Sequence, residues 1–128
     1  MTQPAGTIPA IAVTEAATRL EPASGAGGAD GAGPILVDVR EPNELADVRV
    51  HGAAHFPMST FAARFNDLPK DRPLLLLCAS GSRSAAATAF LIRNGWTDVV
   101  NVMGGIGAWQ RAGLPVRHGP IEPGEGGI

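Results

Sequence analysis

Short apolar segments alternate along the chain with segments whose apolar residues recur at helical spacing. The clearest apolar run is 74–77, four leucines in succession, which predicts a strand buried on both faces of a parallel sheet. Four further strands are expected, at 8–13, 35–39, 53–57 and 99–103. Because the intervening segments have the features of helices, the pattern predicts an α/β domain with a mainly parallel sheet of about five strands and helices on both faces, a three-layer sandwich.

The helices are placed by the residue types that favour helix ends. Thr14 is a candidate N-cap for a helix at 15–20, and Pro42 suits the first turn of the next one. Ser59 or Thr60 precedes a short helix that runs through residue 65. The helix after the leucine run is expected to start near residues 82–84 and to end at 94–95, where a glycine can adopt the left-handed conformation. A last short helix is expected at 107–112.

The length of 128 residues suits one domain, predicted at 8–116 between flexible tails at 1–7 and 117–128, with a flexible glycine-rich loop at 21–34. The net charge of −2 gives no indication of nucleic acid or a membrane as partner. The single cysteine excludes an internal disulfide and a cysteine-based zinc site. A free thiol fits a reducing compartment such as the cytoplasm.

Cys78 stands where the leucine strand ends and the next helix begins. At this junction, free N–H groups and the helix dipole stabilise negative charge and lower the pKa of a thiol. Gly81 lets the backbone turn several N–H groups toward one point, and Arg83 adds a forked cation. We therefore predict a nucleophilic thiolate in an anion-binding loop. The alternative is a buried core cysteine, which does not account for the glycine and the arginine at these loop positions.

The loop Cys78-Ala79-Ser80-Gly81-Ser82-Arg83 resembles the Cys-x-x-Gly-x-Arg loop of the rhodanese family of sulfurtransferases. Further stretches resemble the family in the same order, at 36–44 (LVDVREPNE), 51–53 (HGA), 104–109 (GGIGAW) and 113–115 (GLP). The resemblance covers 8–116 and implies the rhodanese-like fold. One departure is at the turn where the family has Gly-His-Ile-x-Gly-Ala, because its histidine position carries Arg49 and a histidine stands at 51.

The resemblance implies that Cys78 carries sulfane sulfur as a persulfide, held by backbone N–H groups of the anion-binding loop and by Arg83. The residues expected to bind the anion are Ala79, Ser80, Gly81, Ser82, Arg83 and Ser84. The donor would be a small molecule such as thiosulfate, and the acceptor cyanide, a thiol or a protein thiol, with no metal or organic cofactor. Since the loop has a single cation, we expect weak affinity for the thiosulfate dianion.

Two other functions remain open at this stage. A persulfide carrier or binding module would serve a partner protein rather than turn over free substrates. A phosphatase or arsenate reductase of the related fold would need a loop resembling Cys-x5-Arg, one residue longer than this one, and arsenate reduction usually needs a second thiol. The sequence does not indicate the oligomeric state.

Asp38 and Arg40 follow the second predicted strand and are candidates to support the site, with a structural ion pair as the alternative. The Gly104-Gly105-Ile106-Gly107 segment fails the nucleotide-binding spacing and predicts a tight turn into a helix. Trp96 and Trp109 are expected in the core, and the scattered histidines do not predict a metal site.

Overall fold

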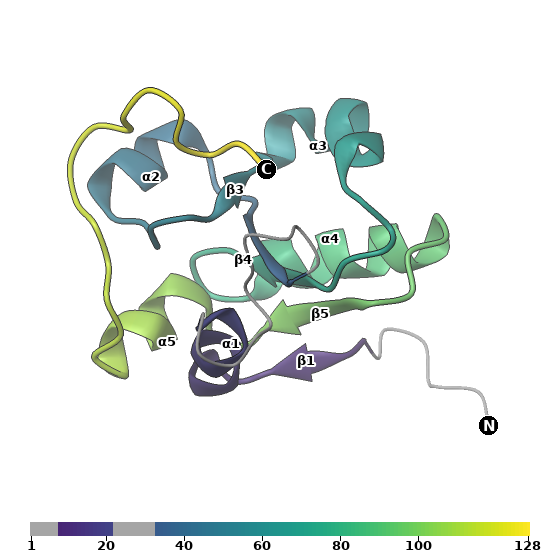
Figure 1. The fold of residues 1–128 in the computed structure, drawn as a ribbon, viewed down its shortest axis with the longest axis horizontal. Coiled ribbons are helices and arrows are strands. Elements are labelled where there is room, and N and C mark those ends of the chain that lie inside the picture. Colours follow the sequence, from purple (N-terminus) through teal and green to yellow (C-terminus); the bar gives the residue numbers. More distant parts are fainter. Residues whose placement is uncertain (1–7, 22–32) are drawn as a thin grey trace.

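The computed structural model describes residues 8–21 and 33–128. The predicted tail at 1–7 and most of the glycine-rich loop lie outside these residues. Five parallel strands form one sheet in the order β1-β5-β4-β2-β3. Figure 1 shows β1 at one side of the sheet, next to β5. The strands are β1 (Ala10–Ile11), β2 (Ile35–Asp38), β3 (Ala54–His55), β4 (Leu74–Leu77) and β5 (Val99–Val102). The α/β class, the parallel direction and the strand count are confirmed.

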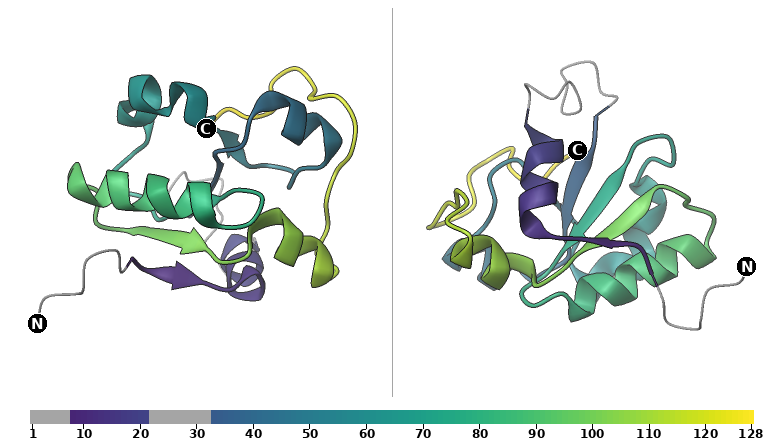
Figure 2. Two further views of the ribbon diagram at one scale, coloured as in Figure 1. Left: turned by 180° about the vertical axis from the view of Figure 1, so that it is seen from behind. Right: turned by 90° about the horizontal axis from the view of Figure 1, so that it is seen from below.

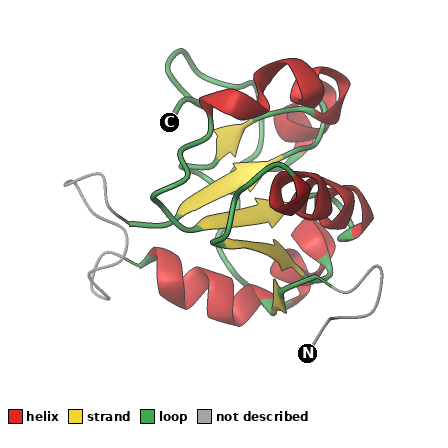
Figure 3. Cartoon of the chain, turned by 90° about the vertical axis from the view of Figure 1, so that its right-hand side faces the viewer, coloured by secondary structure: helices red, strands yellow, loops and turns green. Residues whose placement is uncertain are grey.

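Helices cover both faces of this sheet (Figure 3). They are α1 (Val13–Leu20), α2 (Pro42–Asp47), α3 (Met58–Arg64), α4 (Ser82–Arg93) and α5 (Gly105–Arg111), with a 3-10 turn η2 (Phe65–Asp67) after α3. Side chains of α3 and α4 pack in one core cluster, and those of α1 and α5 pack in another. Figure 2 shows α4 on the opposite side of the sheet from α1. The three-layer arrangement is therefore confirmed.

The leucine run forms the centre of both cores. Leu74 and Leu76 pack in the cluster on the α4 side, whereas Leu75 and Leu77 pack in the cluster on the α5 side. All four are at most 1% exposed. Successive strand residues point to opposite faces, so a strand covered on both sides has no position for a polar residue. β4 pairs with β2 and β5, which places the carboxyl end of the leucine run in the middle of the sheet.

Several predicted helix starts are wrong. α1 begins at Val13 after Ala12 rather than after Thr14, and α3 begins at Met58 after Pro57 rather than at Ser59 or Thr60. The Ser59 hydroxyl instead donates to Glu41, 2.7 Å away. In each case the preceding residue is already extended, so the chain turns into the helix without a side-chain cap.

The beginning of α2 and the end of α4 follow the expected chemistry. Pro42 opens α2, and the side chains of Glu41 and Glu44 form a capping box with the backbone of the first turn. Gly95 has a φ of +103°, the left-handed conformation expected after α4. Trp96 and Trp109 are buried as predicted, and their ring N–H groups donate to carbonyl oxygens at 3.1 and 2.9 Å. None of the described helices is long and apolar enough to span a lipid bilayer.

The C-terminal segment, residues 117–128, differs from the predicted flexible tail. It passes from α5 along α2 to β3 (Figure 1). The backbone of Arg117 pairs with that of Arg49, Gly119 N–H donates to Ala46 O at 2.9 Å, and His55 N–H donates to Gly126 O at 2.8 Å. The structure thus places this segment against the domain, with its backbone hydrogen-bonded to α2 and to the edge strand β3.

Candidate functional site

Cys78 follows β4 directly and precedes α4 by a three-residue loop. Gly81 ends this loop with a φ of +106°, so a glycine, not Ser82 or Ser84, occupies the N-cap of α4. This turn brings the Gly81 N–H to 3.0 Å from Cys78 Sγ, and the first turn of α4 brings Ser84 Oγ to 3.2 Å. The sulfur is therefore surrounded by hydrogen-bond donors at a helix N-terminus, the arrangement predicted from the sequence.

Two opposing effects set the pKa of Cys78. The side chain is 0% exposed, and this burial raises the thiol pKa because a thiolate is poorly solvated there. Hydrogen bonds from the Ser84 side chain and from the backbone of Ser84, Gly81 and Ser80 lower it. Their sum exceeds the burial effect, so the net pKa lies below its ordinary value, which is the direction that a nucleophile needs.

The first turn of α5, which begins at Gly105 rather than at the predicted residue 107, holds the cysteine loop from the other side. Ile106 N–H donates to Cys78 O at 2.8 Å, and Gly107 N–H donates to Ala79 O at 3.1 Å. Gly105 has a φ of +56°, and a Cβ on it would lie 2.6 Å from the carbonyl carbon of Ala79. The tight turn predicted at 104–107 therefore has a second role, because only a residue without a side chain lets α5 approach the loop so closely.

Arg83 pairs with a carboxylate rather than standing free in the loop. Its two terminal nitrogens lie 2.7 Å from the two oxygens of Glu44 in α2, a bidentate contact. This hydrogen bonding lowers the pKa of Glu44 to about 2 and raises that of Arg83, to which a Cys78 thiolate also contributes. The cation predicted for anion binding is thus already compensated, although its side chain remains 36% exposed.

Asp38 and Arg40 form a buried ion pair at the end of β2. Arg40 Nη2 lies 2.9 Å from Asp38 Oδ2, and both side chains are at most 2% exposed. Arg40 Nη2 also donates to Val48 O, at 2.8 Å. The pair connects β2 to the end of α2, the helix that carries Glu44. The charge of Asp38 also contributes to the raised pKa of Arg83.

Asn101 in β5 was not among the residues predicted from the sequence. Its side chain is 7% exposed, its Oδ1 lies 2.6 Å from Ser84 Oγ, and its Nδ2 donates to Gly81 O at 3.3 Å. Glu44 and Gly105 were also missed as parts of the site. The available signal for Asn101 was its place as a polar residue within the apolar strand predicted at 99–103, because polar residues are rare on a doubly covered strand.

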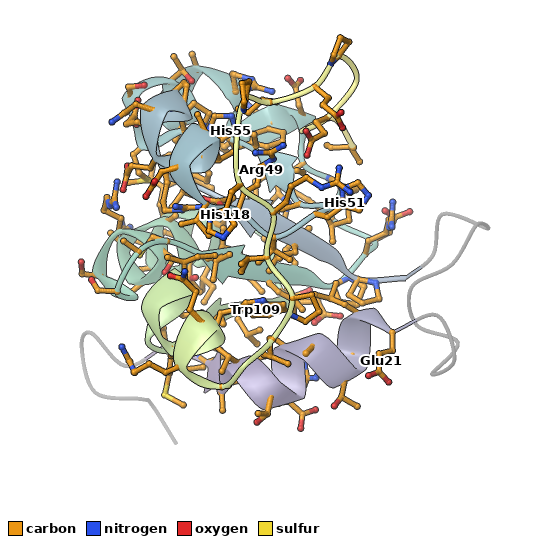
Figure 4. The ribbon with its side chains drawn as sticks, turned by 90° about the vertical axis from the view of Figure 1, so that its left-hand side faces the viewer. Glu21, Arg49, His51, His55, Trp109 and His118 are labelled. Carbon is orange, nitrogen blue, oxygen red and sulfur yellow. The ribbon has the colours of Figure 1, made fainter. Side chains whose placement is uncertain are left out.

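Arg49, at the position of the family histidine, anchors the C-terminal segment (Figure 4). Its guanidinium donates to Gly119 O at 2.6 Å and to both oxygens of Glu125, at 2.7 and 2.8 Å. The hydrogen bond from Arg49 lowers the pKa of Glu125 to about 2. A buried cation needs such partners, which explains why a segment of disordered composition lies against α2.

The predicted loop residues have different positions around the sulfur. Gly81 and Ser84 contact Cys78 directly, Ala79 accepts from α5, and Ser80 contributes its backbone N–H to the lower thiol pKa. Ser82 is exposed at the start of α4. A separate cavity of about 670 Å³ is lined in part by Trp109 and His51, which Figure 4 labels, and Cys78 is not among its lining residues.

Comparison with known proteins agrees with this geometry. A sulfurtransferase of Allochromatium vinosum is 43% identical over 82 residues, which are 64% of this chain and 77% of that protein. Thiosulfate sulfurtransferase GlpE of Actinobacillus succinogenes is 34% identical over 64% of this chain and 74% of its own length. The crystal structure of a rhodanese-related protein from Thermoplasma volcanium superposes with a TM-score of 0.71 at 31% identity, covering 86% and 98% of the two chains. The model of the rhodanese-like domain matches residues 20–112, most of the chain, and the protein therefore belongs to the rhodanese-like domain family.

Proposed function

We propose that the protein transfers sulfane sulfur from a small donor such as thiosulfate to cyanide or a thiol, through a persulfide on Cys78. The observation that carries this proposal is the environment of the sulfur, which accepts hydrogen bonds from Gly81 N–H and Ser84 Oγ at the N-terminus of α4. These donors stabilise negative charge on sulfur in the thiolate and in the persulfide anion alike. Relatives named as sulfurtransferases support the same chemistry.

The reaction consists of two displacements at sulfur. In the first, the Cys78 thiolate attacks the outer sulfur of thiosulfate, a new S–S bond forms, and sulfite leaves with the electrons of the bond that breaks. In the second, cyanide attacks the outer sulfur of the persulfide, thiocyanate leaves and the Cys78 thiolate returns. No metal or organic cofactor takes part. The chain has one cysteine, so a thiol acceptor comes from another molecule.

The paired charge of Arg83 bears on the choice of donor. Both of its terminal nitrogens are engaged by Glu44, so a dianion that approaches the loop meets little net positive charge. We therefore propose weak binding of thiosulfate and better use of a donor with less charge, such as a persulfide. A thiosulfate KM in the low micromolar range would contradict this part of the proposal.

The carrier function is retained as a second candidate because Cys78 is completely buried. Because the sulfur is buried, a donor or acceptor reaches it only after a local movement, and a docked protein can drive such a movement with its binding energy. The phosphatase alternative is not retained, because the short loop from Cys78 to Arg83 leaves less room for a tetrahedral phosphate.

Steady-state kinetics of thiocyanate formation test the proposal. We expect parallel double-reciprocal lines when thiosulfate and cyanide are varied, as ping-pong catalysis requires, and no activity in Cys78→Ser. Intersecting lines, or activity that persists in Cys78→Ser, would contradict it. Slow turnover together with fast single transfer to a protein thiol would favour the carrier.

A further inference from the structure

Asn101 is a buried amide that contacts both residues that donate hydrogen bonds to Cys78 Sγ, Ser84 at its hydroxyl and Gly81 at its carbonyl oxygen. Its Nδ2 donates to the carbonyl oxygen of Gly81, and its Oδ1 lies 2.6 Å from Ser84 Oγ. Gly81 N–H and Ser84 Oγ are in turn 3.0 and 3.2 Å from the sulfur. The Ser84 hydroxyl therefore links the Asn101 amide to the sulfur through two successive hydrogen-bond contacts.

The Ser84 hydroxyl faces two acceptors but has one proton. A hydroxyl donates a single hydrogen bond and can accept others. If Ser84 donates to Asn101 Oδ1, its oxygen is free to accept the proton of a Cys78 thiol, and each of these three side chains has a hydrogen-bond partner. If Cys78 is a thiolate, it needs the Ser84 proton, and Asn101 Oδ1 loses its donor. Thiolate formation thus leaves a buried carbonyl oxygen unpaired, which is unfavourable.

Rotation of the Asn101 amide does not remove this competition. Turning the amide by half a revolution would place Oδ1 where Nδ2 now meets Gly81 O, so that two acceptors would face each other. Exposure of 7% leaves little access for a water molecule to replace the lost donor. In the described part of the chain every buried side-chain nitrogen and oxygen has a partner, so an unpaired Oδ1 would be an exception.

The charged groups around the loop are compensated in pairs. Arg83 of α4 is paired with Glu44 of α2, and Asp38 of β2 is paired with Arg40. With these charges balanced, the position of the Ser84 proton has a direct influence on the sulfur.

We propose that Asn101 is a positioning residue that competes with the Cys78 sulfur for the single Ser84 proton and thereby limits thiolate formation. The inference rests on the proposed function only in taking Cys78 as the nucleophile. It implies that the pH dependence of sulfur loading is set in part by a residue that contacts neither donor nor acceptor.

The test is the pKa of Cys78, measured from the pH dependence of iodoacetamide alkylation. Because Cys78 is the only cysteine of the chain, the alkylation rate measures this thiol alone. In Asn101→Leu, which keeps the approximate size of the side chain and removes the amide, we expect the Cys78 pKa to fall by about one unit, because the thiolate then keeps the Ser84 proton without cost. Ser84→Ala is expected to raise this pKa, because the thiolate loses a donor. In the Ser84→Ala background, Asn101→Leu should leave the pKa unchanged.

A Cys78 pKa that stays the same or rises in Asn101→Leu would overturn the inference. An equal fall with and without Ser84 would also overturn it, because the effect would then not pass through the hydroxyl. Asn101→Val, which suits a strand, replaces Asn101→Leu if thermal melting shows that the latter does not fold. Alkylation requires no sulfur transfer, so the result stands apart from the proposed function, which separate sulfur-loading measurements test.

Discussion

Replacement of Glu44 by glutamine tests whether the carboxylate restrains Arg83 from binding an anionic donor. Glu44→Gln removes the negative charge and keeps a side-chain oxygen that can accept from Glu41 N–H, now 3.0 Å away, so the capping box of α2 is retained. Arg83 would keep its position at the mouth of the loop but lose its counter-charge. We therefore expect tighter binding of thiosulfate in this variant.

The size of the effect follows from the strength of the ion pair. The hydrogen bond from Arg83 is the largest cause that lowers the pKa of Glu44 from 4.5 to about 2. At about 1.4 kcal/mol per pKa unit, this shift corresponds to an upper limit between about 3 and 4 kcal/mol. The Arg83 side chain is 36% exposed, and ion pairs near the surface contribute about 1 kcal/mol or less. An energy of about 1 kcal/mol predicts a thiosulfate KM that is about fivefold lower.

The assay is thiocyanate formation at saturating cyanide with thiosulfate varied. Glu41→Gln is the matched control, because Glu41 is also acidic and lies three residues earlier, but its side chain accepts from Ser59 rather than from Arg83. We expect its KM to stay close to that of the wild type. A KM that is unchanged or higher in Glu44→Gln, or an equal decrease in the control, would refute the reasoning.

Three further predictions concern the framework of the site. Arg49→Leu should lower the thermal midpoint and expose the C-terminal segment to limited proteolysis, because Gly119 O and the Glu125 carboxylate lose the hydrogen bonds from the guanidinium; cleavage at the wild-type rate would contradict this. Gly105→Ala should lower the thermal midpoint, because a Cβ there collides with the backbone of Cys78 and Ala79, whereas Gly127→Ala, where an added Cβ meets nothing within 4 Å, should not; equal midpoints would contradict this. Acid should destabilise the fold: because the pKa values of Glu44 and Glu125 are lowered to about 2 from 4.5, their contribution is complete above about pH 5 and is lost as the pH falls toward 2, so denaturant midpoints that do not decrease over this range would contradict the pairing.

Local patterns in the sequence were sufficient to predict the sheet and the cysteine loop. The leucine run predicted a strand covered on both faces, and this strand places Cys78 at the carboxyl end of the sheet. Glycine in the cysteine loop and after α4 has the left-handed conformation that these turns require. These features depend on a few neighbouring residues, so the sequence shows them directly.

The partners that complete the site come from distant parts of the chain. Arg83 and Glu44 are separated by 39 residues, and Ser84 and Asn101 by 17. No periodicity relates such residues, and the strand order needed to bring them together is itself a tertiary property. The sequence therefore indicated a cation in the loop but not the carboxylate that compensates it.

The C-terminal segment shows a conflict between composition and contact. Its glycines and prolines are typical of a disordered tail. Glu125 of this segment nevertheless compensates the charge of the buried Arg49, which lies 76 residues earlier in the chain. The departure from the family pattern at Arg49 was the available signal, since a cation in place of histidine next to a buried strand requires an anion from somewhere in the chain.

The most direct test of the account is the intact mass of the protein after incubation with thiosulfate, measured before and after addition of cyanide. We predict a gain of one sulfur atom in the wild type, its loss as thiocyanate forms, and no gain in Cys78→Ser. No gain with either thiosulfate or a small persulfide donor, or an equal gain in Cys78→Ser, would contradict the claim that Cys78 carries the transferred sulfur.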